Sequence, residues 1–151
     1  MLSIAVDTPI GTIGVMETNG AITRIDLTGP AKGETSTLLD EAAMQLQAYF
    51  AGELKHFDLP LAPRGSSFQQ AVYEAMYAIP FGETRTYGEL AEQVNGFAQA
   101  VGQACGSNPI PIIIPCHRVL AANGLGGYSG FGGLETKIKL LQMEDAYPYL
   151  L

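Results

Sequence analysis

Tryptophan is absent from this sequence, cysteine occurs only twice, and basic residues are few. Two cysteines do not make the disulfide framework of a small secreted protein, so we expect a reducing, cytoplasmic location. Eight Lys and Arg side chains stand against fifteen Asp and Glu, which gives a net charge of −7. This balance argues against a general affinity for nucleic acid, because basic side chains that neutralise phosphates supply most non-specific binding. Any DNA contact must then depend on a local surface.

Long apolar runs are missing as well. The longest, Ile110 to Pro115, is far too short to cross a bilayer. Residues Met1 to Thr8 lack the basic start and apolar stretch of a secretion signal. The 151-residue chain is nevertheless 47% hydrophobic, which is enough for a buried core. We therefore expect a folded protein with no membrane contact, built as one ordinary domain or two small lobes.

The N-terminal part has the pattern of a small antiparallel sheet covered by a helix. Apolar alternation between turn residues predicts three strands, at Ile4–Val6, Thr12–Met16 and Ala21–Leu27. Apolar residues at helical spacing then predict a helix from Ser36 to Ala51. The segment from Lys55 to Arg64, which contains Pro60 and Pro63, has the composition of a linker. We therefore expect an N-terminal lobe of residues 1–62 and a C-terminal lobe of residues 63–151.

The C-terminal lobe is mainly helical in pattern. A first helix starts at Ser66 or Ser67, either of which can cap it. Two short helices follow, Tyr87 to Val94 and Ala98 to Cys105, separated by a glycine-containing turn, as is typical of a helix-turn-helix. The second of these has almost no bulk and no charge. It is suited either to tight packing in the core or to close approach to a narrow groove of DNA.

The segment before and after Cys116 holds most of the chemical information. The run Ile112-Ile113-Ile114 predicts a buried strand, which Pro115 ends so that Cys116 emerges at a turn. Cys116 is then either a reactive nucleophile or a small core residue, whereas Cys105, inside a helix pattern, is assigned to the core. A free thiol has a pKa of about 8.5, so a nucleophilic sulfur needs a base. His117 is the nearest candidate.

A carboxylate is needed to hold and polarise such a base. Glu135, Glu144 and Asp145 follow His117 in the sequence. Glu144 stands out because it ends a predicted helix, where the helix dipole disfavours a negative charge. It is either paired with His117 or solvated at the surface.

Eight segments spread along nearly the whole chain carry a family signature. They are Thr8-Pro9-Ile10-Gly11, Phe68-Gln69-Gln70-Ala71-Val72-Tyr73, Ile79-Pro80-Phe81-Gly82-Glu83-Thr84, Thr86-Tyr87-Gly88-Glu89-Leu90-Ala91, Asn108-Pro109-Ile110-Pro111, Pro115-Cys116-His117-Arg118-Val119, Gly126-Gly127-Tyr128-Ser129 and Gly133-Leu134-Glu135-Thr136-Lys137. In order and spacing they resemble the O6-alkylguanine-DNA alkyltransferase family. The resemblance implies an α/β fold. Its N-terminal lobe would be a ribonuclease-H-like sheet and helix, and its C-terminal lobe mainly helical with a winged-helix-like helix-turn-helix.

The resemblance also implies an activity and a partner. The alkyl group of O6-alkylguanine in double-stranded DNA would pass irreversibly to Cys116, once per protein molecule, with O4-alkylthymine left open as a second substrate. Family roles carry over to catalytic, substrate-binding and DNA-binding positions: Cys116, His117, Glu144, Asn108 and Tyr87; Val119, Tyr128 and Ser129; and Gln99, Ala100, Gly102 and Arg118. We expect a monomer with no cofactor. We also expect no metal, because the N-terminal lobe lacks cysteine and has only His56.

Some positions depart from the family pattern. Gln99 stands where the family carries an arginine that fills the gap left by a flipped base. The turn before it is short, which makes Phe97 a second candidate for that role, and Phe131-Gly132 resembles an insertion in the pocket loop.

These departures and the acidic charge leave one rival open, an alkyl acceptor of the same fold that binds DNA weakly and acts on free bases or small donors. Lesion sensing without transfer conflicts with the presence of Cys116. A Cys-His hydrolase would need an oxyanion site that the sequence does not announce.

Overall fold

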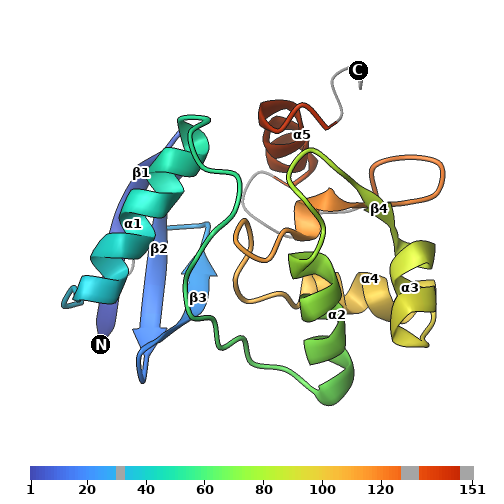
Figure 1. Cartoon of the computed structure of the whole chain (residues 1–151), viewed down its shortest axis with the longest axis horizontal. Helices are drawn as coiled ribbons and strands as arrows, with labels where there is room; N and C mark the ends of the chain where they lie inside the picture. The colour runs from blue at the N-terminus through green and yellow to red at the C-terminus, as the bar shows by residue number, and fades with distance from the viewer. Residues whose placement is uncertain (30–32, 127–132, 147–151) are drawn as a thin grey trace. The chain divides into compact units, whose positions relative to one another are not determined.

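The computed structural model describes residues 1–29, 33–126 and 133–146. By its backbone contacts the chain separates into two compact units, Met1–Arg64 and Gly65–Leu151, which are described one at a time (Figure 1). The boundary expected from the sequence, after residue 62, falls close to this division.

The first unit is built on a three-stranded antiparallel sheet in the order β1 (Leu2–Thr8), β2 (Gly11–Thr18) and β3 (Ala21–Asp26). The strands predicted from the sequence are present. The first two are longer than expected, because the ladder continues through polar pairs such as Asp7 opposite Thr12. Apolar alternation marks only the part of a strand that faces a core, so it misses such ends.

Helix α1 (Thr37–Phe50) covers one face of this sheet (Figure 1). Ser36, expected to start the helix, is its cap, since its hydroxyl accepts a hydrogen bond from the amide of Leu39. The buried side of the helix and the sheet form the core of the unit, with these fully buried members: Ile13, Val15, Ile22, Leu39, Ala42 and Leu46.

The second unit contains a helix-turn-helix. Helices α2 (Ser67–Tyr77), α3 (Tyr87–Val94) and α4 (Ala98–Gly106) pack against one another. Ser66 and Thr86 cap α2 and α3 through complete capping boxes. Asn95 ends α3 in the left-handed conformation, with φ at 56°, which turns the chain sharply into α4.

A short parallel ladder links the helix-turn-helix to the cysteine segment. Strand β4 (Arg85–Thr86) directly precedes α3, and it pairs with β5 (Val119–Leu120), which follows the 3₁₀ turn η1 (Cys116–Arg118). Helix α5 (Leu134–Met143) packs against η1 (Figure 1). The ladder therefore brings the start of α3 beside the residues that follow Cys116.

The predicted strand before Cys116 is wrong: residues 110–114 form a buried turn. The amide of Ile114 donates to the carbonyl of Ile110 over 2.9 Å, and Ile112 takes a positive φ of 75°. All four isoleucines are at most 2% exposed. Pro109, Pro111 and Pro115 lack amide hydrogens at alternate positions, so one side of an extended chain here would lose most of its ladder donors, and the stretch buries its apolar side chains as a turn instead.

No helix in the described part of the chain is both long enough and apolar enough to span a membrane.

Candidate active site

Cys116 opens the 3₁₀ turn η1 and is 8% exposed. Its amide donates to the carbonyl of Ile114 over 2.8 Å, which joins it to the buried isoleucine turn. Burial raises the pKa of the Cys116 thiol, while a hydrogen bond from Asn108 and the charge of Lys137 act in the opposite direction. The thiol is therefore protonated at rest and needs a base to react.

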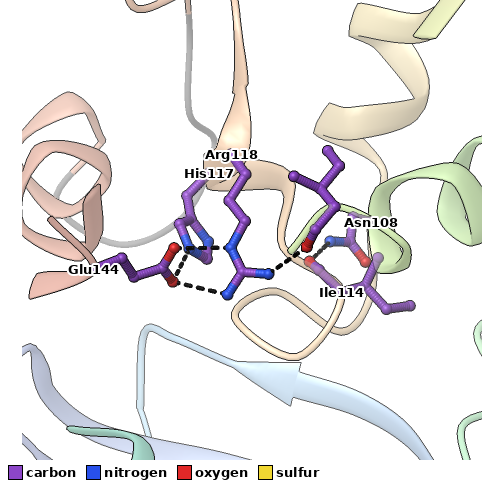
Figure 2. Close-up of polar contacts among 6 residues, drawn as sticks. Asn108, Ile114, His117, Arg118 and Glu144 are labelled. Atoms are coloured by element: carbon purple, nitrogen blue, oxygen red, sulfur yellow. Dashed lines mark hydrogen bonds and ion pairs between the residues drawn. The ribbon is translucent and has the colours of Figure 1, made fainter. Parts of the chain in front are cut away.

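The amide side chain of Asn108 holds the turn that precedes Cys116. Its Nδ2 donates to the carbonyl of Ile114 over 2.8 Å (Figure 2). Its Oδ1 accepts from the amide of Ile110 over 3.0 Å. One side chain thus ties both ends of the turn together. This bracing keeps the β-branched Ile112 at a positive φ, a conformation that costs about 1–3 kcal/mol.

His117 and Glu144 meet inside the second unit. The Nε2 atom of His117 lies 2.7 Å from Oε2 of Glu144, and both side chains are fully buried (Figure 2). Of the two fates open to Glu144 in the sequence, pairing with His117 is the one the structure adopts. The carboxylate sits at the C-cap of α5, against the helix dipole, and the partners it finds there offset that position.

Arg118 completes this cluster and neutralises it. Its Nε and Nη2 donate to the two oxygens of Glu144 over 2.8 and 3.0 Å, and its Nη1 donates to the carbonyl of Ile79 over 2.7 Å (Figure 2). Only 6% of the residue is exposed. The expectation that Arg118 contacts DNA does not fit this geometry, because its donors are directed inward to groups that would otherwise be buried without partners.

The tautomer of His117 follows from the charge of Glu144. Burial disfavours the carboxylate, but the bonds from His117 and Arg118 outweigh it and lower the pKa of Glu144 to about 2. An ionised carboxylate only accepts, so Nε2 of His117 must carry the hydrogen. Burial lowers the pKa of His117, which keeps the ring neutral. Its Nδ1 therefore holds a free electron pair, and among the described residues it has no hydrogen-bond partner.

Lys137 is a functional candidate that the sequence reasoning missed. It is fully buried on α5, and its Nζ donates to the carbonyls of Val119 and Leu125 over 2.7 and 2.6 Å. Burial lowers its pKa to about 8. The available signal was its helical spacing to Leu140 and Leu141, which places a lysine on the buried face of α5.

The residues expected to bind the damaged base are only partly described. Lys137 fixes the carbonyl of Val119, and Tyr87, at the start of α3, lies against the backbone of Gly126. A Cβ atom on Gly126 would come within 2.8 Å of the Tyr87 hydroxyl, so only glycine fits there. Tyr128, Ser129 and the Phe131-Gly132 pair lie outside the described residues.

Helix α4 has one buried and one exposed side. Val101, Ala104 and Cys105 are buried, and the Sγ of Cys105 lies 3.4 Å from the Sδ of Met76, which agrees with a core role for this cysteine. Gln99 is exposed, and Ala100 and Gly102 are partly exposed. Nothing lies within 4 Å of a Cβ atom built on Gly102, so this face is open. The helix thus packs in the core on one side and leaves a small, neutral surface on the other.

Within the ranges that the structure describes, no three His, Cys, Asp or Glu side chains gather in a way that could hold a metal ion.

Comparison with known proteins places both units in one family. Residues 1–63 match the ribonuclease-like domain of 6-O-methylguanine DNA methyltransferase, and residues 67–146 match the DNA binding domain of the same family. A methylated-DNA–protein-cysteine methyltransferase of Mycolicibacterium paratuberculosis is 46% identical over 149 residues, which cover 92% of this chain and 89% of that protein. One from Methanosarcina acetivorans is 53% identical over 116 residues, 75% of this chain and 73% of that protein.

A solved structure gives the same result in three dimensions. Mycobacterium tuberculosis OGT, crystallised in complex with DNA, superposes with a TM-score of 0.85 at 42% identity, over 97% of this chain and 94% of that one. The match spans both units, so it covers the sheet, the helix-turn-helix and the cysteine segment together. On this evidence the chain belongs to the 6-O-methylguanine DNA methyltransferase family.

Proposed function

We propose that this protein repairs DNA by moving the alkyl group of O6-alkylguanine onto the sulfur of Cys116. The observation that carries the proposal is the contact between Glu144 and His117, which leaves Nδ1 of the ring as an acceptor on the residue that follows the buried Cys116. Membership of the family and the likeness to a relative solved with DNA support it. We assign the chemistry to residues 63–151.

The transfer is a displacement at carbon. The proton of the Cys116 thiol passes to Nδ1 of His117, and the sulfur attacks the alkyl carbon. A carbon–sulfur bond forms, the bond from that carbon to O6 breaks, and its electron pair stays with guanine. The guanine anion then takes a proton from the hydroxyl of Tyr87, the proposed donor, and the proton that His117 received from Cys116 returns to the Tyr87 oxygen. The thioether is stable, so each protein molecule reacts once.

The buried cluster prepares this step without carrying net charge at rest. Glu144 holds the His117 ring in one tautomer, and the Glu144–Arg118 pair is neutral overall. When His117 gains a proton, the adjacent carboxylate stabilises the new charge. Asn108 and Lys137 favour the thiolate of Cys116, each by lowering its pKa. The base would be read by the carbonyl region of Val119 together with Tyr128 and Ser129.

An alkylated O6 atom lies inside the base stack of duplex DNA, so its nucleotide must be turned out before it meets Cys116. We assign the DNA surface to the open side of α4, with Gln99, Ala100 and Gly102, where small neutral residues permit close approach to a groove. We further propose that the protein acts as a monomer in the cytoplasm, where its thiols stay reduced.

Intact-protein mass measurement tests the proposal. After incubation with a duplex oligonucleotide that contains O6-methylguanine, the protein should gain the mass of one methyl substitution, and peptide mapping should place it on Cys116. The gain should stop at one per molecule, however large the excess of DNA.

Two variants make the test specific. Cys116→Ala should show no gain while its circular dichroism and unfolding midpoint stay close to those of the wild type. Cys105→Ala, the matched control, should still be methylated. An unchanged mass of the wild-type protein, or repeated turnover, would contradict the proposal.

A further inference from the structure

Phe97 exposes an aromatic ring that packing within the protein does not explain. It is 82% exposed, whereas the other exposed large hydrophobic residues among those described are aliphatic: Met1, Met44 and Leu134. Single exposed apolar side chains are common on protein surfaces, so the place of Phe97 in the fold, together with its exposure, is what indicates a contact. Phe97 is the last of the three residues, 95–97, that join the two helices of the helix-turn-helix.

The backbone holds Phe97 in this position. Asn95 turns the chain with a φ of 56°, and the amide of Gly96 donates to the carbonyl of Ala91 over 2.9 Å. A Cβ atom on Gly96 would come within 2.7 Å of the Phe68 ring on α2, so the turn lies tight against that helix. The carbonyl of Phe97 then accepts from the amide of Val101 over 3.0 Å. Its ring is thus displayed from a fixed turn.

The surroundings of Phe97 are neutral. Helix α4 carries no charged residue, and its exposed positions next to the turn are Ala98 and Gln99. A basic surface would attract phosphates strongly, and this helix has no charge with which to do so, which favours contact with bases as the source of its hold on DNA. Minor-groove proteins obtain such contact by inserting apolar side chains between base pairs, where the ring unstacks one step of the duplex.

We propose that Phe97 inserts its ring into the base stack beside the alkylated nucleotide and occupies the space that this nucleotide leaves when it is turned out. This inference rests on the proposed function, because a wedge is needed only if the lesion must leave a duplex. Stacking on a ring tolerates any neighbouring base and does not depend on phosphate charge. Stacking therefore suits an acidic protein that must act on damaged bases in many different DNA sequences.

The rate of methyl transfer from two substrates tests the proposal. With duplex DNA containing O6-methylguanine, Phe97→Ala should react at least about tenfold more slowly than wild type, which corresponds to about 1.4 kcal/mol. With a single-stranded oligonucleotide carrying the same base, where no pair has to be opened, the loss should be at most about twofold. Phe97→Trp should restore the duplex rate, and Met44→Ala, which truncates another exposed side chain, should leave both rates unchanged.

A spectroscopic signal separates a wedge from a merely structural role. In a duplex with 2-aminopurine next to O6-methylguanine, unstacking of the probe raises its fluorescence. Binding of Cys116→Ala should raise this signal, and binding of the double variant with Phe97→Ala should raise it much less at matched saturation.

The outcomes distinguish the inference from the function beneath it. If Phe97→Ala reacts with the duplex as fast as wild type, or if it slows both substrates equally, the wedge is excluded although transfer stands. A larger duplex-specific loss in Gln99→Ala than in Phe97→Ala would also overturn the assignment. If the wild-type protein methylates itself from neither substrate, the proposed function itself fails.

Discussion

Single side chains in the buried cluster have their charges fixed by one another. Arg118 balances Glu144, and the carboxylate orients His117, which stays neutral because a second buried cation would have no counter-charge. Breaking such a cluster leaves one charge without a partner in the interior, which is far more costly than losing a surface ion pair. The stability of the protein should therefore depend on pH and on substitutions in this cluster, and the direction of each change can be predicted.

Acid should destabilise the protein in two stages. Below pH 6.5 the unfolded chain binds a proton at His117 that the folded protein, with its lowered pKa, does not bind. Glu144 has a pKa of about 2 when folded and 4.5 in its ordinary state, so the stability it supplies is complete above pH 4.5 and is lost between about pH 4.5 and 2. This second stage amounts to up to about 3 kcal/mol.

Urea unfolding between pH 8 and pH 3 measures the effect. Glu144→Gln should flatten the profile below pH 4.5 and lower the stability at pH 7. Glu135→Gln, which changes an exposed carboxyl at the start of the same helix, serves as the control. A wild-type stability that stays constant from pH 8 to pH 3 would contradict the assignment of charges.

Arg118→Met should lower the free energy of unfolding by about 3–5 kcal/mol, because it leaves the Glu144 carboxylate buried with one partner fewer. DNA affinity of the protein that remains folded should keep its salt dependence, since the Arg118 side chain faces inward. Arg85→Met is the matched control, because its pair with Glu83 is at the surface and contributes about 1 kcal/mol or less. A reduced salt slope in Arg118→Met would return this arginine to the DNA surface.

Among the helices, α4 combines a side that packs in the core with an exposed side, and both consist mostly of small residues. Its buried side packs against α2 and α3, and its open side presents Gln99 without any charge. If the open side is the DNA surface proposed above, a cation added there should meet phosphates, and one added on the exposed face of α3 should do so less. The open face is thus where DNA affinity can be changed without repacking the core.

Gln99→Arg should strengthen binding to lesion-containing duplex and steepen the slope of log affinity against log salt by up to about one. Gln93→Arg adds the same charge at an exposed position of α3 and should have the smaller effect. Fluorescence anisotropy at fixed salt, repeated from low to moderate salt, gives both quantities. Equal or weaker binding of Gln99→Arg would refute the placement of this helix on DNA.

At the scale of the whole molecule, charge limits how DNA can be held. The C-terminal unit has four basic residues, and two of them, Arg118 and Lys137, are buried on internal partners. The other two are Arg85, which pairs with Glu83 near the surface, and Lys139, which is exposed. The protein therefore needs shape and apolar contact where many DNA-binding proteins use basic side chains.

Binding to duplex DNA should accordingly depend weakly on salt. With two phosphate contacts the slope should be no steeper than about −2, so the affinity should fall by about tenfold between roughly 50 and 200 mM salt. A salt titration by anisotropy on a lesion-containing duplex measures it, with Cys116→Ala used to prevent transfer. A slope of about −5 or steeper would mean that many more cations reach the DNA, for example from the N-terminal unit.

Features that depend on neighbours along the chain can be predicted from the amino-acid sequence. The cap at Ser36, the capping boxes at Ser66 and Thr86 and the turn at Asn95 all lie within a few residues of the groups they serve, so their patterns could be read directly. The adjacency of Cys116 and His117 is written in the sequence too, and motif order made the family recognisable.

Contacts between groups far apart in the chain depend on how the helices and turns pack, which the sequence pattern does not show. Glu144 could be named as a candidate for His117, but the pairing depends on α5 packing against η1, twenty-seven residues back in the chain. The inward turn of Arg118 and the burial of Lys137 were missed, because a charged residue reads as exposed until its partner is known. The isoleucine run was misread for the same reason: apolar content predicts burial, whereas the choice between strand and turn was made by the prolines and by Asn108 bridging both ends.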